Sequence, residues 1–183
     1  MKRSRPAAKP RQHARRRAKA PGRNAPLDLD RFVPYRIATL GNLLVRSGSK
    51  VYSRRFGLAI REWRILAVLG EGRPLSAVEI VRRTAIDKGR VSRTVASLLR
   101  RGLVAREADA FDARRTMLRL SLKGRALYRR VVPLAAARER ALLAVLTAPE
   151  RRQLERLLAK LHERAEAMFA RLPGAPDEDE TAG

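Results

Sequence analysis

The sequence contains no cysteine, only two histidines and few aromatic residues, and each shortage argues against a class of function. Without cysteine the chain has neither disulfides nor cysteine-ligated zinc, and its composition fits the reducing cytoplasm, which is its expected location. His13 and His162 lie far apart in the sequence, so neither a histidine metal site nor a histidine-based catalytic triad is expected. We also find no glycine-rich phosphate loop. The sequence therefore predicts a protein that is not an enzyme and has no cofactor or metal.

Acidic residues are scarce as well. The 183 residues include 18 Asp and Glu against 42 Lys and Arg, which gives a formal net charge of +24. An excess of this size attracts polyanions, and the sequence has no long uncharged apolar run of the kind that crosses a membrane. Double-stranded DNA is therefore the expected partner, and a membrane is not. Hydrophobic residues make up 45% of the chain, which is enough for a folded core.

The two ends of the chain differ in charge from each other and in composition from the middle. Residues 1–26 carry ten Lys and Arg and four prolines but no acid, which predicts a disordered basic arm. Residues 173–183 form a short acidic tail with Asp177, Glu178, Asp179 and Glu180. Two interpretations of this tail remain open: a solvated end, or a segment that folds back on the basic surface and competes with DNA. Residues 27–172 are the predicted folded domain.

The stretch from Asp87 to Gly102 predicts a helix with two different faces. Asp87 can cap the first turn with its carboxylate, and Gly102 is suited to end the helix in a left-handed conformation. Apolar residues at helical spacing predict one buried face, formed by Val91, Val95, Leu98 and Leu99. The opposite face is polar and basic, and its predicted members are Gly89, Arg90, Arg93, Ser97 and Arg100.

A second helix is expected just before this one. Ser76 and Glu79 have the spacing of a capping box, and the helix that they begin should end near Arg83. Only a short turn of Thr84, Ala85 and Ile86 then remains before the Asp87 cap. Two helices joined by so tight a turn, the second with a basic outer face, are typical of a helix-turn-helix motif. The alternative is a surface helix whose arginines are merely solvated.

Further elements are expected on both sides of this motif. A helix from about residue 30 to Phe56 is stopped by Gly57, and residues 59–69 form a second helix in which Trp63 anchors the core. Residues 103–107 and 116–120 are predicted strands around a charged loop, which together form a wing. A long helix should follow Ser121, and a capping box at 147–150 should begin the last one. The last helix carries an apolar stripe of Leu154, Leu157, Leu158, Leu161, Ala165, Met168 and Leu172.

Three segments of this region resemble the signature of the multiple antibiotic resistance regulator (MarR) family. They are Leu-Arg-Arg-Gly-Leu-Val-Ala-Arg at 99–106, Asp-Ala-Arg-Arg at 112–115 and Leu-Ser-Leu-Lys-Gly-Arg-Ala-Leu at 120–127. The resemblance implies a mainly α fold with a small β-wing. A winged helix-turn-helix would occupy residues 58–121, and dimerisation helices would occupy 27–57 and 122–172.

The same resemblance implies a function. The protein would be a sequence-specific DNA-binding transcriptional regulator, a ligand-responsive homodimeric repressor that binds a pseudo-palindromic operator. Relatives commonly respond to small aromatic or phenolic effectors, and this chain is expected to do the same. The excess charge and the basic arm leave one alternative open, a non-specific architectural DNA-binding protein.

Helix geometry and the family resemblance together select the residues expected to contact DNA. They are Lys88, Gly89, Arg90, Ser92, Arg93, Arg100, Arg114 and Arg115. Arg90, Ser92 and Arg93 are expected at base edges, whereas Lys88 and Arg100 are expected at phosphates. The resemblance places Arg114, beside Arg115, in the minor groove and makes Asp112 the residue that orients the wing loop.

Overall fold

The structure, a computed structural model, describes residues 26–109, 112 and 115–170. They belong to two compact units, one up to Arg46 and one from Ser47 onward. The predicted basic arm, apart from Pro26, and the predicted acidic tail lie outside the described residues. Among the residues that are described, no helix has both the length and the apolar character needed to span a bilayer.

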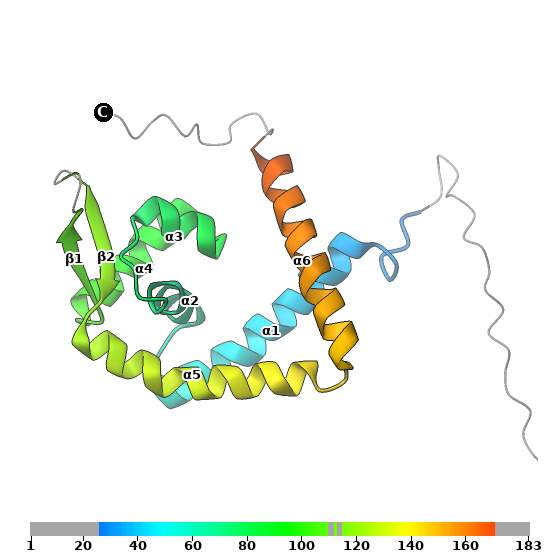
Figure 1. Ribbon diagram of the computed structural model, residues 1–183, viewed down its shortest axis with the longest axis horizontal. Coiled ribbons are helices and arrows are strands. Elements are labelled where there is room, and N and C mark those ends of the chain that lie inside the picture. Colours follow the sequence, from blue (N-terminus) through cyan, green and yellow to red (C-terminus); the bar gives the residue numbers. More distant parts are fainter. Residues whose placement is uncertain (1–25, 110–111, 113–114, 171–183) are drawn as a thin grey trace, which may run out of the picture. The chain divides into compact units, whose positions relative to one another are not determined.

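The chain is mainly helical, with one two-stranded sheet (Figure 1). Its elements in order are α1 (Val33–Phe56), α2 (Ile60–Leu69), α3 (Ala77–Thr84), α4 (Lys88–Arg100), β1 (Val104–Ala108), β2 (Thr116–Leu120), α5 (Leu122–Leu143) and α6 (Ala148–Phe169). The predicted fold class, mainly α with a small β-wing, is therefore confirmed. Helix α1 begins at Val33, a few residues later than the predicted start near residue 30.

Most helix ends occur where a local signal in the sequence places them. Gly57 follows α1 with a φ of +61°, and Gly102 follows α4 with a φ of +65°, a region that costs glycine little because it has no side chain. Ser76 caps α3 as predicted: its Oγ accepts from the amide of Glu79 at 3.2 Å, while the Glu79 carboxylate accepts from the Ser76 amide at 2.8 Å. The Oγ of Ser121 caps α5 in the same way.

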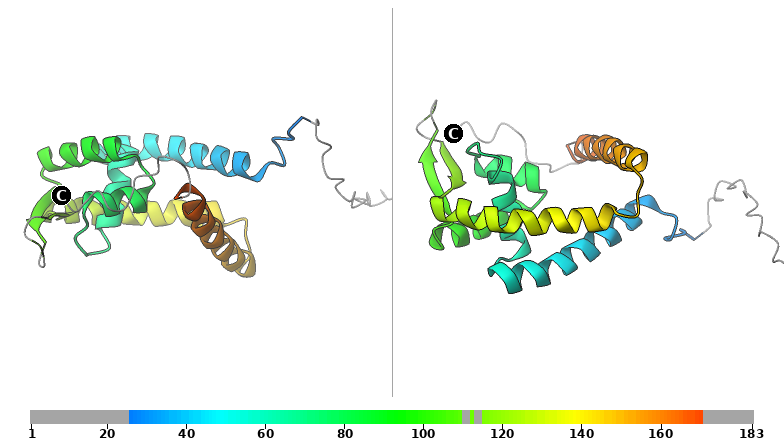
Figure 2. Two further views of the ribbon diagram at one scale, coloured as in Figure 1. Left: turned by 90° about the horizontal axis from the view of Figure 1, so that it is seen from above. Right: turned by 60° about the horizontal axis from the view of Figure 1, so that its bottom comes forward.

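The hydrophobic core lies among α2, α3, α4, the wing and the first half of α5, which pack side by side in Figures 1 and 2. The fully buried residues are Leu58, Ile65, Leu66, Leu75, Ile80, Val91, Leu98 and Val131. Trp63 is only partly buried, and its ring stacks between Tyr52 and Tyr128 with centroid distances of 5.5 and 5.9 Å. Trp63 therefore packs against the core, as predicted, although it is not enclosed by it.

Helix α6 differs from the other helices of its unit because it buries none of its residues. Its apolar stripe stays exposed, and the side chains of Leu157, Leu158 and Leu161 are each about half accessible, at 50%, 50% and 48%. Apolar positions at helical spacing normally mark the face that a helix packs against something else. No part of the chain that the structure describes buries this face.

Candidate nucleic-acid interface

The beginning of α4 is organised by Asp87. One carboxylate oxygen of Asp87 accepts from the backbone amide of Arg90 at 2.9 Å, which is the predicted helix cap. The other oxygen lies 3.2 Å from Nε of the Arg90 side chain. Both side chains are more than half exposed, so the ion pair contributes little to stability. It does orient the guanidinium, and it leaves the two terminal nitrogens of Arg90 for another acceptor.

The positions of α4 that the sequence selected for contact with DNA are exposed. Lys88, Gly89, Arg90, Ser92, Arg93 and Arg100 are all exposed. Arg93 leans toward the start of the helix, because a Cβ built on Gly89 would lie 3.6 Å from an Arg93 terminal nitrogen. Two arginines and a glycine without a side chain therefore share the first turns of α4, which is the part of a recognition helix that approaches base edges.

One residue predicted for this outer face does not belong to it. Ser97 is half-buried, and its hydroxyl donates to Oε1 of Glu62 at 3.0 Å. The other oxygen of Glu62 accepts from Arg101 at 2.7 Å, and Arg101 also donates to the carbonyl of Gly57 at 3.0 Å. Glu62 is itself buried, so this network joins α2 to the end of α4. The prediction for Ser97 was wrong because Glu62 supplies an acceptor that α4 alone does not reveal.

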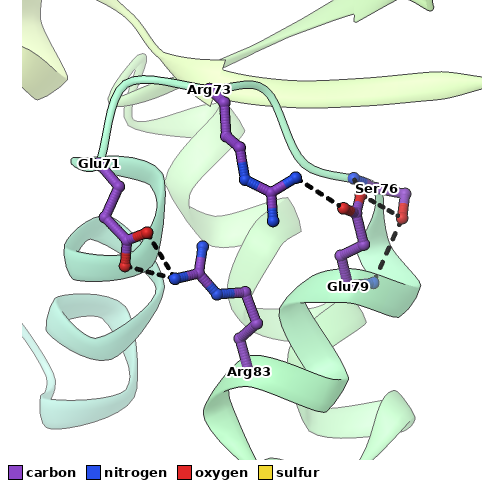
Figure 3. A network of polar contacts seen from close by, with 5 residues as sticks. All are labelled: Glu71, Arg73, Ser76, Glu79 and Arg83. Carbon is purple, nitrogen blue, oxygen red and sulfur yellow. Dashed lines mark hydrogen bonds and ion pairs between the residues drawn. The ribbon is translucent and has the colours of Figure 1, made fainter.

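A second polar network holds α3 behind the recognition helix (Figure 3). One terminal nitrogen of Arg83 donates to both carboxylate oxygens of Glu71 at 2.5 Å, which ties α3 to the start of the loop after α2. Arg73 donates to Glu79 at 3.2 Å, next to the Ser76 cap. Both pairs connect the loop of residues 70–76 to α3.

These contacts shift the ionisation of the groups that make them. The hydrogen bond from Arg83 holds the pKa of Glu71 below its ordinary value of 4.5 and raises the pKa of Arg83 in return. The pKa of Glu79 is also lowered, chiefly by the backbone hydrogen bond from Ser76. All three groups are therefore charged at neutral pH, and the capping box is intact there.

The turn between α3 and α4 has the length predicted for a helix-turn-helix. Ala85 adopts a left-handed conformation with a φ of +50° and a ψ of 34°, which reverses the chain immediately after α3. This conformation costs an L-residue roughly 1–2 kcal/mol. Arg64 of α2 donates to the carbonyl of Thr84 at 2.6 Å and so fixes the residue before the turn.

The wing is a regular antiparallel hairpin. Residues of β1 and β2 pair from Val104 with Leu120 to Ala108 with Thr116. Glu107 and Arg119 form an ion pair across the two strands. Beyond the strands, the amide of Arg115 donates to the carbonyl of Asp112 at 2.9 Å, and both residues are exposed. The orienting role of Asp112 remains a prediction, and Arg114 lies outside the described residues.

Two features of the site were not found from the sequence. The Glu62–Arg101 pair bridges residues 39 positions apart, and the only local signal for it is Glu62 itself, the single acidic residue of helix α2. Three arginines, Arg119, Arg125 and Arg129, gather around one hollow between α2, β2 and α5, and no local pattern joins them. Within the ranges that the structure describes, no group of three or more acidic or histidine residues could hold a metal ion.

Comparison with known proteins supports this arrangement of elements. A family model described as the MarR family matches residues 56–115. An HTH-type transcriptional repressor of Mycobacterium tuberculosis is 32% identical over 130 residues, which cover 68% of this chain and 94% of the relative.

Solved structures agree with the sequence relatives. A MarR/EmrR family transcriptional regulator from Acinetobacter sp. ADP1 is 31% identical with a TM-score of 0.73, and the match covers 77% of this chain and 99% of that one. The Bordetella bronchiseptica regulator BpsR is 26% identical with a TM-score of 0.65, and the match covers 75% and 97% of the two chains. Its DNA binding is regulated by 6-hydroxynicotinic acid.

These relatives confirm the resemblance noted in the wing and its flanking segments. They are transcriptional regulators and not enzymes, so the expected absence of enzymatic activity agrees with them. A helix capped by Asp87 with an exposed basic face, a tight turn and a two-stranded wing are the elements that such regulators share. The chain belongs to the MarR family of winged helix-turn-helix transcriptional regulators.

Proposed function

We propose that this regulator is a ligand-responsive homodimeric repressor that recognises a pseudo-palindromic operator. The observation that supports sequence recognition most strongly is the start of α4. There Arg90 and Arg93 are exposed. Within the Arg90 guanidinium, Asp87 pairs with Nε, so the two terminal nitrogens of Arg90 are left to bind a base. Arginine reads guanine through two parallel hydrogen bonds from such a fork.

The uncovered apolar residues support the homodimer. Leu157, Leu158 and Leu161 of α6 are about half exposed, and no residue of this helix is buried. Oligomers of identical subunits are usually closed by two-fold symmetry, so a second copy can cover the same face on both chains. Two recognition helices would then enter successive major grooves, with half-sites about 34–36 Å apart.

The response to a ligand is proposed by analogy with a relative. The DNA binding of BpsR is regulated by 6-hydroxynicotinic acid, an aromatic acid. An effector of this chain would belong to the same small aromatic or phenolic class. It acts by favouring one of two dimer conformations that differ in affinity for the operator, because a ligand shifts only an equilibrium in which it binds the two states unequally.

Comparing specific with random DNA tests the proposal. A fluorescently labelled duplex from the promoter of the protein's own gene and a shuffled duplex of equal length are titrated at fixed salt. A repressor should prefer the promoter site by roughly a thousandfold or more. Equal affinities would favour the architectural protein that the net charge of +24 also permits.

Arg93→Ala tests the role of α4 within this proposal. A bidentate arginine–guanine contact contributes about 1–3 kcal/mol of discrimination, so the affinity of the variant for the operator should fall by about 5- to 160-fold, and its affinity for random duplex by much less. Lys88→Ala is the matched control, since the loss of a phosphate contact weakens all sequences alike. Equal losses on the two duplexes with Arg93→Ala would show that Arg93 reads no base.

A further inference from the structure

The acidic segment of residues 177–180 has no part in the proposed function, although it is the longest run of consecutive acids in the chain. It reads Asp-Glu-Asp-Glu, in a sequence with 18 acids against 42 Lys and Arg. An extended chain spaces consecutive residues by about 3.3–3.6 Å. One strand of double-helical DNA carries a negative charge per about 3.4 Å of helix axis. When extended, the segment therefore has nearly the linear charge density of the strand that α4 is proposed to bind.

The exposed face at the start of α4 is a cationic surface that fits such a segment. Lys88 and Arg93 are exposed and form no ion pair with any residue in the described part of the chain. Arg90 pairs through Nε with Asp87, which leaves its two terminal nitrogens for a further carboxylate. The N-terminal end of the helix dipole adds partial positive charge at the same place. Gly89 has no side chain that would keep an acidic chain away from this end.

The chain is long enough to bring the segment to α4. Asp177 lies seven residues beyond Ala170, the last described residue, and Glu180 lies ten residues beyond it. The four acids can therefore extend to about 23–36 Å from the end of α6. In Figure 1, α6 runs from the end of α5 back toward the side of the unit that carries α3, the helix before α4. Both α4 and α6 belong to the unit that begins at Ser47.

We propose that residues 177–180 bind the start of α4 in their own chain when no DNA is bound. Lys88, Arg90 and Arg93 are the partners of the carboxylates. Operator and random duplex must both displace the segment, so it lowers the affinity for each by the same factor. It thereby limits the general attraction of a chain of net charge +24 to DNA without altering the preference among sequences. The effect on DNA affinity rests on the proposed function; the contact between the segment and α4 does not.

The predicted basic arm is the other cationic partner that the chain offers. Its ten Lys and Arg outnumber the cations at the start of α4. The start of α4 is favoured because its cations are held on a folded helix, so less conformational freedom is lost when an acidic segment binds there. The two partners carry different lysines, which makes them distinguishable by experiment.

Crosslinking without DNA tests the contact. A water-soluble carbodiimide joins a carboxylate directly to a lysine amine that touches it, and mass spectrometry identifies the joined residues. In the full-length protein at low salt, residues 177–180 should be linked to Lys88, and the product should have the mass of one chain. The link should disappear at about 1 M salt, where the Debye length falls to about 3 Å. Lys123, exposed at the start of α5, is the control and should not be linked.

Neutralising the segment tests its effect on DNA binding. The quadruple variant Asp177→Asn, Glu178→Gln, Asp179→Asn and Glu180→Gln should bind promoter and random duplex at least about threefold more tightly, by the same factor on both, since several exposed ion pairs no longer compete. Its affinity should also fall more steeply with salt, because DNA no longer exchanges one set of ion pairs for another.

A second quadruple variant controls for net charge. It removes four exposed carboxylates from α5 and α6 through Glu139→Gln, Glu155→Gln, Glu163→Gln and Glu166→Gln. Its affinity for either duplex should change less than about twofold, because salt screens charges outside the contact. An equal gain in this control would reduce the effect of residues 177–180 to net charge and overturn the proposal.

The crosslinks supply further ways to overturn it. Links to Lys2, Lys9 or Lys19 in place of Lys88 would show that the segment pairs with the basic arm, and links of doubled mass would place it on a second copy. A link to Lys88 without a gain in affinity in the neutralised variant would show that the segment does not compete with DNA. If the wild-type protein preferred neither duplex, the proposed function would fail, while the link to Lys88 would still decide the contact.

Discussion

The winged unit, meaning the elements from α2 to β2, and helix α6 place their apolar residues in opposite environments. The large apolar residues from α2 to β2 other than Val78 are at least partly buried within one chain, and Leu66, Ile80 and Leu98 are fully buried. Helix α6 buries nothing, although its apolar residues repeat just as regularly. The winged unit is therefore stabilised by apolar burial within one chain. Helix α6 obtains such stabilisation only from a partner that covers its apolar face. Changes in the two regions should accordingly affect different properties.

The largest expected effect is on assembly. In the double variant Leu158→Glu and Leu161→Glu, four leucines per dimer are lost from the proposed interface, which removes roughly 6–12 kcal/mol at about 1.5–3 kcal/mol for each buried leucine. Light scattering should then detect monomers. Ala159→Glu adds one negative charge per chain, half as many as the double variant, on the opposite side of α6 and should remain dimeric. A wild-type protein that is already a folded monomer would show that α6 forms no dimer interface.

A smaller effect, confined to the winged unit, is expected from Glu62→Gln. This change removes the charge that accepts from Arg101 and Ser97, and hydrogen bonds to charged groups contribute about 1.5–3 kcal/mol. Urea unfolding should report a loss of that size, while light scattering should show unchanged assembly. Glu107→Gln breaks the exposed pair with Arg119 and should cost less than about 1 kcal/mol. Similar losses in both variants would show that the burial of Glu62 has no energetic consequence.

Part of the pH dependence of stability should belong to the winged unit, and a further part to α6, where the hydrogen bond from the Thr147 amide lowers the pKa of Glu150. The pKa values of Glu71 and Glu79 are lowered in the folded protein, so their stabilisation is complete above the ordinary value of 4.5 and is lost as the pH falls through the folded pKa. The urea midpoint should therefore drop between about pH 6 and pH 3. The double variant Glu71→Gln and Glu79→Gln should flatten this dependence. An unchanged slope in the variant would assign the acid sensitivity to other carboxylates.

The smallest expected change is a gain. Ala85 has a φ of +50°, so Ala85→Gly relieves a conformational cost of roughly 1–2 kcal/mol while adding about 0.5–1 kcal/mol of chain entropy in the unfolded state. The net stabilisation should be below about 1.5 kcal/mol, measured by urea unfolding. Ala77→Gly, within the first turn of α3, is the control and should destabilise instead. If Ala85→Gly also destabilised the protein, the positive φ of Ala85 would have no conformational cost that glycine can remove.

The sequence by itself determined the elements and the outer face of the recognition helix except at Ser97. Signals such as the Ser76–Glu79 cap, the Asp87 cap and the glycines at 57 and 102 act within a few residues, so they operate before any packing occurs. The exposure of Arg90 and Arg93 followed from helical spacing alone.

Only the tertiary structure decided which polar residues face one another. Ser97 turned out to face Glu62, and of two adjacent arginines Arg100 is exposed while Arg101 is held by Glu62 and Gly57. The hollow between Arg119 and Arg125 likewise requires a strand and a helix to meet. Such contacts depend on how separate elements pack, and the amphipathic pattern specifies which face of a helix is buried but not the partner that it meets.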